Sequence, residues 1–424
     1  MKNAAEPKRL DAVLGNVRVP LSLVADPQTF GGRRDRDCLA GHLVVRGGRV
    51  VALTESGAAD VDLGGMLVTT PFVEPHCHLD KCYTIERLDF SGGSLAEAIA
   101  AQAKDKQSWT RNDLRMRATR GLEELWHAGG RMARTHIDWE VDARDSARIP
   151  RAWQILGEVC EDWRGRIIVQ RAALVPIEAM ADIAYAEGVA RVIASTGGLL
   201  GAFVFDQPNR HEGILNMVRV AMKHDLALDF HVDEGLAPSL DGIELIAQAV
   251  IDTGYPGPVL CGHVCNLGSL EAAARQRRIN LIARASLSVV SLPSSNLYLQ
   301  DRGNGMPRQR GLTAVKELLA AGVNVLFGTD NVQDAFCPVG VHNPAATLAS
   351  GIIGAHLDPP LGTWLPMVTT HAASAVGLHL PCIDRAAAGQ LLVWDTPHVS
   401  ALLGGGFHRW RSLESALASG RILL

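Results

Sequence analysis

The chain has 424 residues, which exceeds one ordinary domain but suits a barrel of about 250 residues with a small appended module. Hydrophobic residues make up 47% and charged residues 20%, so the chain can bury a large core and is not disordered over most of its length. The net charge of −4, from 41 basic and 45 acidic residues, argues against a nucleic-acid partner.

The first 66 residues are expected to form the N-terminal part of a small β unit. Short β-rich runs occur there, such as residues 42–46 and 49–53, and the Gly47-Gly48 pair between them is a hairpin signal. The start of the chain has no apolar segment, and nowhere do about 18 apolar residues follow one another. We therefore expect no export signal and no membrane span.

From residue 67 to residue 383, strand-like apolar runs alternate with longer helical stretches, which is typical of repeated βα units. Eight runs are predicted to be strands: 68–74, 132–137, 167–174, 192–195, 226–231, 259–261, 281–290 and 323–328. Helices are predicted between them, for example at 94–103, 113–127, 213–223 and 313–321. The pattern predicts an α/β fold, a (β/α)8 TIM barrel.

Residues 384–424 contain two further strand-like runs, at 390–393 and 421–424. We expect this segment to return to the N-terminal β unit and complete it. The eight cysteines of the chain form no CxxC pair, which is typical of free thiols in a reducing compartment. The expected location is the cytoplasm.

His76 and His78 are the most informative residues of the chain. They stand two positions apart at the end of the first predicted barrel strand, so their side chains project to the same side. Imidazole is a good ligand for zinc and for ferrous iron. Because an HxH pair also arises by chance, its interpretation as a metal site depends on residues further along the chain.

Four later residues complete a hydrolytic site. His231, Glu234, His263 and Asp330 each stand at or just after the C-terminal end of a predicted strand, on the face where such barrels keep their active sites. Three imidazoles and one carboxylate would leave an open coordination position for water on one divalent metal ion. Glu234 could carry a proton, His263 could orient the water, and Asp330 could accept the proton of that water. Taken singly, Glu234 is also compatible with a solvated loop carboxylate and His263 with a structural histidine.

These residues belong to motifs that recur in consistent order between about residues 66 and 345. The motifs are PFVEPHCHLD at 71–80, RTHID at 134–138, HVDE at 231–234, GH at 262–263, NLYLQ at 296–300, FGTDN at 327–331 and PVG at 338–340. Together they resemble the amidohydrolase superfamily, and specifically its cytosine deaminase branch.

The resemblance implies a distorted (β/α)8 barrel flanked by a β-sandwich, one zinc or iron ion, and hydrolytic release of ammonia from a ring carbon. It implies that His76, His78, His231 and Asp330 bind the metal, while Glu234 and His263 serve proton transfer and water activation. Some members bridge two metals with a carboxylated lysine at the fourth strand. Residues 192–197 contain no lysine, which favours one metal. The resemblance also permits homo-oligomers.

Four positions are predicted to contact the substrate: Val175, Asn331, Phe336 and Lys81. Cytosine deaminases carry a glutamine, an aspartate and a tryptophan where this chain has the first three of these residues. Such donor and acceptor changes shift ring preference by several kcal/mol, which argues against cytosine itself. In having Lys81 after Asp80, and in having Asn331, the chain resembles a related branch of the superfamily. That branch hydrolyses N-alkylamino-triazine rings such as N-isopropylammelide.

Two alternatives remain for the charged groups near the site. Lys81 could instead form a structural ion pair with a neighbouring carboxylate. His136 and Asp138 are expected to be supporting groups rather than metal ligands. The triazine branch has no glutamate matching Glu234, which favours deamination.

The sequence therefore predicts a hydrolytic deaminase of a small amino-substituted heterocycle of the cytosine, isocytosine or triazine kind. Metal-activated water would attack the amino-bearing ring carbon. The alternative is an amidohydrolase that removes an alkylamine or opens a cyclic amide. A non-catalytic metal-binding sensor on the same barrel is a third reading.

Overall fold

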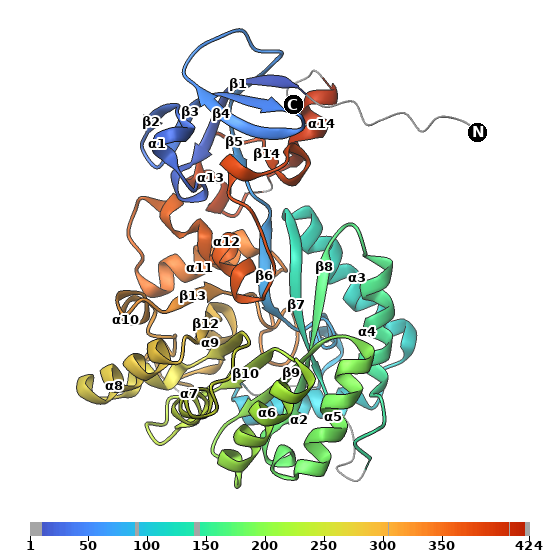
Figure 1. The fold of residues 1–424 in the computed structure, drawn as a ribbon. Helices are drawn as coiled ribbons and strands as arrows, with labels where there is room; N and C mark the ends of the chain where they lie inside the picture. The colour runs from blue at the N-terminus through green and yellow to red at the C-terminus, as the bar shows by residue number, and fades with distance from the viewer. Residues whose placement is uncertain (1–10, 90–92, 140–144, 304, 407, 420–424) are drawn as a thin grey trace.

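The computed structural model describes residues 11–89, 93–139, 145–303, 305–406 and 408–419. Figure 1 shows a β unit, built from the N-terminal and C-terminal segments, packed against a larger body in which helices surround parallel strands. Each body has its own sheet, and the chain passes from the first to the second along β5 (Val61–Thr69) and β6 (Phe72–Cys77).

Eight parallel strands form the sheet of the larger body, in the order β13-β12-β11-β10-β9-β8-β7-β6. After β6 they are β7 (Gly130–Asp138), β8 (Ile168–Pro176), β9 (Leu199–Val204), β10 (Leu228–Val232), β11 (Val259–His263), β12 (Ser288–Ser291) and β13 (Asn324–Phe327). The backbone N–H of Asp330 donates to the carbonyl of His76 at 2.8 Å, and a parallel bridge joins Cys77 to Asp330. The first and last strands therefore meet, and the predicted (β/α)8 barrel is confirmed.

Helices follow the barrel strands and cover the outside of the sheet (Figure 1). They are α2 (Leu95–Lys106), α3 (Arg111–His127), α4 (Arg151–Asp162), α5 (Ile183–Thr196), α6 (Arg210–His224), α7 (Gly242–Thr253), α8 (Ala272–Arg284), α9 (Pro293–Leu299), α10 (Val315–Ala320), α11 (Pro344–Ala355) and α12 (Thr370–Ala375). The helices predicted at 94–103, 113–127, 213–223 and 313–321 correspond to α2, α3, α6 and α10.

The second sheet joins both ends of the chain, in the order β15-β14-β5-β1-β3-β2 with β4 paired to β3. Besides β5 it contains β1 (Ala12–Pro20), β2 (Arg33–Asp35), β3 (Cys38–Arg46), β4 (Arg49–Thr54), β14 (Leu392–Trp394) and β15 (Trp410–Ser412). Three short helices accompany it: α1 (Pro27–Phe30), α13 (Val399–Leu403) and α14 (Leu413–Ser419).

The return of the C-terminal segment to the N-terminal β unit is confirmed, because β14 pairs with β5 in antiparallel fashion. The hairpin at Gly47 and Gly48 is also confirmed: both have positive φ, 57° and 77°, as a tight turn between β3 and β4 requires. Trp394 of β14 packs against Phe72 of the first barrel strand, with ring centroids 5.6 Å apart, and so ties the two bodies together. The strand predicted at 421–424 lies outside the described residues.

Two predicted barrel strands were misplaced. Residues 192–195 lie in α5, and the fourth strand is β9. The buried residues Tyr185, Val189, Val192 and Ile193 recur at helical spacing, so the β-branched run lies on the inner face of an amphipathic helix. In the predicted seventh strand, residues 281–284 end α8, and β12 begins only at Ser288. Since β9 contains no lysine either, the argument for one metal carries over to the correct strand.

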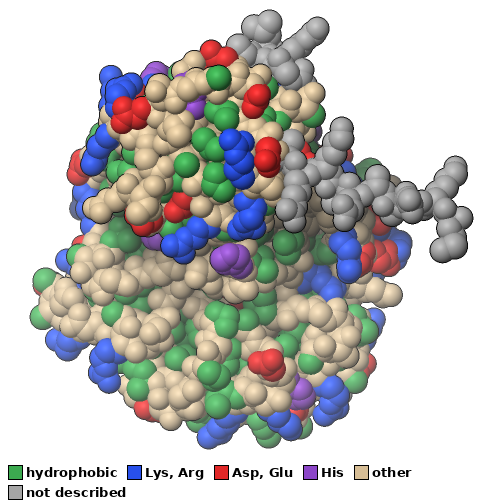
Figure 2. Space-filling view, turned by 45° about the horizontal axis from the view of Figure 1, so that its top comes forward, with side chains coloured by type: hydrophobic (Ala, Val, Ile, Leu, Met, Phe, Trp, Pro, Cys, Tyr) green, Lys and Arg blue, Asp and Glu red, His purple; other side chains and the backbone are tan. Residues whose placement is uncertain are grey.

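Charged side chains of both signs are spread over the face seen in Figure 2. Within the described segments, no helix has both the length and the apolar character that crossing a bilayer requires. All eight cysteines are free thiols, as predicted.

Candidate functional site

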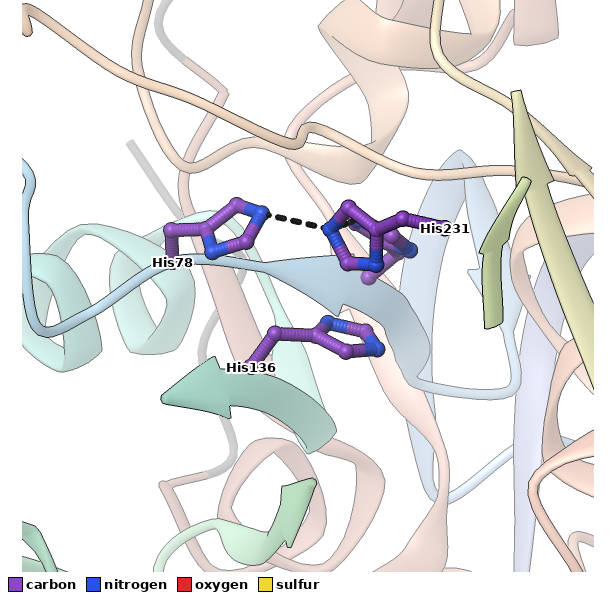
Figure 3. Close-up of side chains that lie close together, drawn as sticks. His78, His136 and His231 are labelled. Atoms are coloured by element: carbon purple, nitrogen blue, oxygen red, sulfur yellow. Dashed lines mark hydrogen bonds between the residues drawn. The ribbon is translucent and has the colours of Figure 1, made fainter. Parts of the chain in front are cut away.

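The predicted metal ligands come from three strands and meet at one end of the barrel. His76 lies on β6 and His78 directly after it, His231 lies on β10, and Asp330 follows β13. The Nε2 atom of His231 lies 3.1 Å from Nε2 of His76 and 3.0 Å from Nε2 of His78. One oxygen of Asp330, Oδ1, lies 3.3 Å and 3.1 Å from the same two atoms. Figure 3 shows His78 and His231 pointing toward each other.

These separations fit four ligands of one five-coordinate cation, which leaves one position for water. Neighbouring ligand atoms about 2.05 Å from such a metal lie between about 2.9 Å and about 3.6 Å from one another. Hydrogen bonds alone do not account for the arrangement, because an imidazole carries one N–H when neutral and each of these nitrogens faces more than one neighbour. The four groups, all buried, are therefore suited to hold one divalent metal ion.

The charge states of the cluster also suit a cation. Burial, reinforced by the charge of Lys81, lowers the pKa of His78 to about 3. Burial and the neighbouring imidazoles hold the pKa of His231 well below its usual range. Burial alone would raise the pKa of Asp330, but the nearby imidazoles of His76 and His78 outweigh it and keep that pKa well below its usual range. Neutral imidazoles and an anionic carboxylate are the forms that bind a metal.

His136 of β7 lies beside the cluster and offers an alternative fourth imidazole. One of its ring nitrogens lies within 4.8 Å of ligand atoms of His76, His78 and His231, and its ring centroid lies 4.0 Å from that of His76. Figure 3 shows His136 next to His78 and His231. However, its Nε2 lies 2.9 Å from Oδ1 of the buried Asp229. Because that nitrogen already faces a carboxylate, we interpret His136 as a supporting group and Asp330 as the ligand.

Two glycines leave the room that the His76 ring needs. A Cβ atom on Gly262 of β11 would lie 2.9 Å from Cε1 of His76, and one on Gly328 would lie 2.9 Å from Cβ of His76. Real Cβ atoms essentially never approach another atom so closely. The side chain of His76 therefore occupies space that glycine leaves free, at its ring by position 262 and at its Cβ by position 328.

Glu234 and His263 lie together next to the cluster. Glu234 follows β10, His263 ends β11, and Oε1 of Glu234 lies 3.6 Å from Nδ1 of His263. Burial, followed by the charge of Asp330, raises the pKa of Glu234 well above its usual range. Nδ2 of Asn296 of α9 lies 3.0 Å from Nδ1 of His263, and a neutral ring that accepts this hydrogen bond has its own proton on Nε2.

A cavity of about 280 Å³ opens beside these groups. Its walls are mostly apolar and aromatic, with a few polar side chains, as in typical sites for small ligands. The wall residues other than the metal ligands, Glu234 and His263 are Lys81, Leu95, Ile99, Gln102, Ala103, Lys106, Asp138, Trp139, Leu174, Pro176, Phe203, Phe205, Asn331 and Phe336.

Three of the four predicted substrate contacts line this cavity. Lys81 is also in an ion pair, since its Nζ donates to Oδ1 of Asp138 at 2.7 Å while Lys106 binds the other oxygen of that carboxylate. The Nζ atom of Lys81 lies 5.5 Å from the centre of the Phe336 ring. Asn331 donates its side-chain N–H to Asp334 at 2.7 Å. The ion pair expected of Lys81 is therefore present, and its contact with a substrate stays a prediction.

Val175 does not line the cavity, contrary to the sequence-based expectation. It is fully buried in the hydrophobic core, while its neighbours Leu174 and Pro176 face the cavity. Successive side chains of a strand point to opposite faces, so an error of one position reverses the direction. The position in the cavity wall that was predicted for Val175 is therefore occupied by Leu174 and Pro176.

Several wall residues carry no motif and were not predicted. Trp139 follows β7 directly. Phe203 is the last residue but one of β9, and Phe205 follows that strand directly. Gln102 lies in α2 and is distant in sequence from the ends of β6 and β7. Position directly after a strand could have identified Trp139, but the misplacement of the fourth strand hid Phe203 and Phe205.

The chain is similar in sequence to known amidohydrolases and deaminases. Residues 177–380 match the model of the "Amidohydrolase family". A pterin deaminase of Rhizobium rhizogenes is 33% identical over 420 residues, which cover 97% of this chain and 92% of that protein. An N-isopropylammelide isopropyl amidohydrolase of a Pseudomonas species is 24% identical over 75% of this chain and 77% of its own length.

The fold has a close counterpart among solved structures. A 5-methylcytosine deaminase from Klebsiella pneumoniae, liganded with 5-fluorocytosine, superposes with a TM-score of 0.78 at 25% identity and covers 97% of each chain. Together, the relative that is one-third identical over nearly the whole length and the buried histidine and aspartate cluster lead to one conclusion. This chain belongs to the amidohydrolase superfamily.

Proposed function

We propose that this protein is a metal-dependent hydrolytic deaminase of an amino-substituted nitrogen heterocycle, with a 2-amino-4-oxopyrimidine ring, as in pterin or isocytosine, as the substrate class. The observation that carries the proposal is the joint position of Glu234, His263 and the metal-binding cluster at one end of a cavity with aromatic walls. A site that only bound a metal would need neither a proton carrier nor a cavity.

The residues suited to hold the metal are His76, His78, His231 and Asp330. When bound, a divalent ion acts as a Lewis acid and lowers the pKa of water at an open coordination position to near neutrality. The second oxygen of Asp330, Oδ2, has no hydrogen-bond partner among the described residues. That oxygen can accept a proton from the water that attacks the ring.

Glu234 moves protons between the water and the substrate. Its raised pKa lets the carboxyl group hold a proton near neutral pH, as a general acid must. Glu234 protonates the ring nitrogen beside the amino-bearing carbon. Its carboxylate then takes the hydroxyl proton of the added water and passes it to the departing amino group, and the proton that Asp330 accepted returns to Glu234. The carbon–nitrogen bond breaks, ammonia leaves, and the ring carbon keeps the water oxygen as a carbonyl.

His263 stabilises the charge that develops during attack. When Asn296 donates to its Nδ1, the N–H of the ring is on Nε2, which has no other partner among the described residues. The φ of His263 is +71°, a left-handed conformation that costs energy for a non-glycine residue. A fixed donor of this kind lowers the barrier without reorganisation.

The cavity walls favour a flat ring. Trp139, Phe203, Phe205 and Phe336 present aromatic surfaces to the cavity. The relative of Rhizobium rhizogenes is a pterin deaminase, and pterin contains the 2-amino-4-oxopyrimidine ring fused to a second ring. Removal of an alkylamine from a triazine is the second candidate, supported by Lys81 in the cavity wall and by the N-isopropylammelide hydrolase relative.

The test is release of ammonia, or of alkylamine, by metal-loaded protein from pterin, isocytosine, cytosine, 5-methylcytosine and N-isopropylammelide. We expect ammonia from pterin or isocytosine, with a product one mass unit heavier. Release of isopropylamine in preference to ammonia would favour the second candidate. Full metal content with no product from any ring would refute both.

Glu234→Gln is the matched variant, because it keeps the shape of the side chain but removes proton transfer. We expect kcat to fall about 100-fold to 10,000-fold while metal content stays unchanged. Glu212→Gln, at an exposed position of α6, is the control and should keep full activity.

A further inference from the structure

Gln102 is a buried amide with no partner in the described part of the chain. Its side chain is 2% exposed and lines the cavity beside the metal-binding cluster. Neither Nε2 nor Oε1 has a hydrogen-bond partner. Burying a polar group without a hydrogen bond costs free energy, so such groups are rare in folded proteins. The missing partner is therefore expected to come from a ligand in the cavity.

Gln102 lies on the face of α2 that lines the cavity. Ser94 caps the helix in a capping box with Glu97, which fixes where α2 begins. Leu95, Ile99, Gln102, Ala103 and Lys106 then line the cavity at helical spacing. This face of α2 covers one side of the cavity. Apart from the terminal Lys106, Gln102 is its one polar residue, so the amide cannot be explained as part of a solvated face.

We infer that Gln102 is the specificity-determining residue that hydrogen-bonds a lactam edge of the substrate ring. Its Nε2–H donates to the ring carbonyl, and its Oε1 accepts from the adjacent ring N–H. A carboxamide matches a lactam because each presents one donor and one acceptor side by side. The inference rests on the proposed function and narrows its substrates to amino heterocycles with a free ring N–H next to a carbonyl.

The neighbouring polar side chains of Asn331 and Lys81 already bind protein carboxylates, whereas the Gln102 amide has no protein partner among the described residues. The Nδ2 atom of Asn331 is bound to Asp334, and Lys81 is bound to Asp138. The aromatic walls hold the faces of the ring but cannot distinguish one polar edge from another. A site built to bond a polar edge rejects an analogue that lacks it by large factors, because its own polar atoms are then left buried and unpaired.

The experiment compares metal-loaded wild-type protein with Gln102→Leu and Gln102→Glu. The substrates are the lactam ring that releases ammonia fastest and its ring N-methyl analogue. Wild type should prefer the lactam about 100-fold or more in kcat/KM. Gln102→Leu should lower kcat/KM for the lactam about 100-fold and reduce that preference to less than about tenfold. Gln102→Glu, which keeps the acceptor but loses the donor, should also lose activity with the lactam.

Binding provides a second measurement that does not depend on turnover. Isothermal titration calorimetry with deaminated pterin, which keeps the lactam edge, should show at least about tenfold weaker binding to Gln102→Leu than to wild type. The melting temperature of ligand-free Gln102→Leu should equal or exceed that of wild type, because an unpartnered amide is removed from the interior. Gln107→Leu, at the exposed end of the same helix, is the control and should change none of these values.

The outcomes separate the inference from the proposed function. If wild type releases ammonia but Gln102→Leu keeps its preference and its kcat/KM, the inference is wrong and the proposed function stands. If no ring is deaminated but deaminated pterin binds in a manner that depends on Gln102, the proposed function alone is wrong. If no ring is bound or deaminated by metal-loaded wild type, both are wrong.

Discussion

The carboxylate of Glu74 binds both the backbone and the side chain of Thr329, which is 255 positions later in the chain. Oε1 of Glu74 accepts the backbone N–H of Thr329 at 3.0 Å and that of His76 at 3.0 Å, while Oε2 accepts the Thr329 hydroxyl. One buried side chain therefore links the C-terminal end of β6, which carries His76, to the segment after β13, which carries Asp330.

Glu74→Gln should weaken the metal site without touching a ligand. The amide turns an N–H toward groups that are themselves donors, so at least one buried hydrogen bond is lost. We expect the free energy of unfolding to fall by about 1–3 kcal/mol and metal affinity to fall about 10-fold to 100-fold. Denaturant unfolding and competition with a chromophoric chelator measure the two effects. Glu178→Gln, at an exposed position, is the control, and an unchanged metal affinity in Glu74→Gln would contradict the linking role.

Gly262→Ala should displace the ring of His76. The added Cβ would lie 2.9 Å from Cε1 and 3.1 Å from Nδ1 of the ring. We expect metal affinity to fall about tenfold or more, in line with other changes that disturb a ligand's orientation. Gly303→Ala is the matched control, because nothing lies within 4 Å of its added Cβ. Equal metal content of both variants after dialysis against a chelator would count against the steric argument.

Removal of the metal should destabilise the fold as well as abolish activity. Without the cation, the Asp330 carboxylate and three buried imidazoles lose the ligand that they surround. A ligand present at about a thousand times its Kd stabilises the folded state by about 4 kcal/mol. We expect chelation to lower the melting temperature by several degrees and added zinc or ferrous iron to restore it. Asp330→Asn should show a much smaller shift, and a chelated protein with unchanged melting temperature would exclude a metal coupled to folding.

Because His342 is buried, the free energy of unfolding should decrease as the pH falls below 6.5. Burial, with a contribution from Arg120, lowers the pKa of this histidine to about 3, against a usual value of 6.5. Below pH 6.5 the unfolded chain binds a proton that the folded chain does not take up until about pH 3, so acid favours unfolding across that range.

The measurement for His342 is the free energy of unfolding between pH 6.5 and pH 4.5. In His342→Gln its slope should be shallower than in wild type by up to about 1.4 kcal/mol per pH unit. His211→Asn, at an exposed position, should leave the wild-type slope unchanged. Parallel slopes for His342→Gln and wild type would show that the buried ring does titrate in the folded state.

Much of the fold could be predicted because strands and helices have different periods. The error at 192–195 arose because a short β-branched run has no period of its own, and its helical context becomes clear only with Tyr185 and Val189 included. The error at Val175 arose because strand boundaries were known only approximately, and one position reverses the direction of a side chain.

Gln102 was missed for a different reason. Its significance depends on burial, and nothing in the sequence near it indicates that α2 closes one wall of the cavity. A glutamine in a helix is usually exposed to water. Only the packing of α2 over the barrel end makes this amide buried and unpartnered.

By itself, the sequence determined the fold class and the types of residue that stand at the strand ends. Parallel strands bring their C-terminal ends to one rim, so His76, His231 and Asp330 were expected to meet although up to 254 positions separate them. The tertiary structure alone decided which neighbours face the cavity, which carboxylate joins β6 to β13, and which amide lacks a partner. Those properties depend on rotations and contacts between distant segments, and no local pattern encodes them.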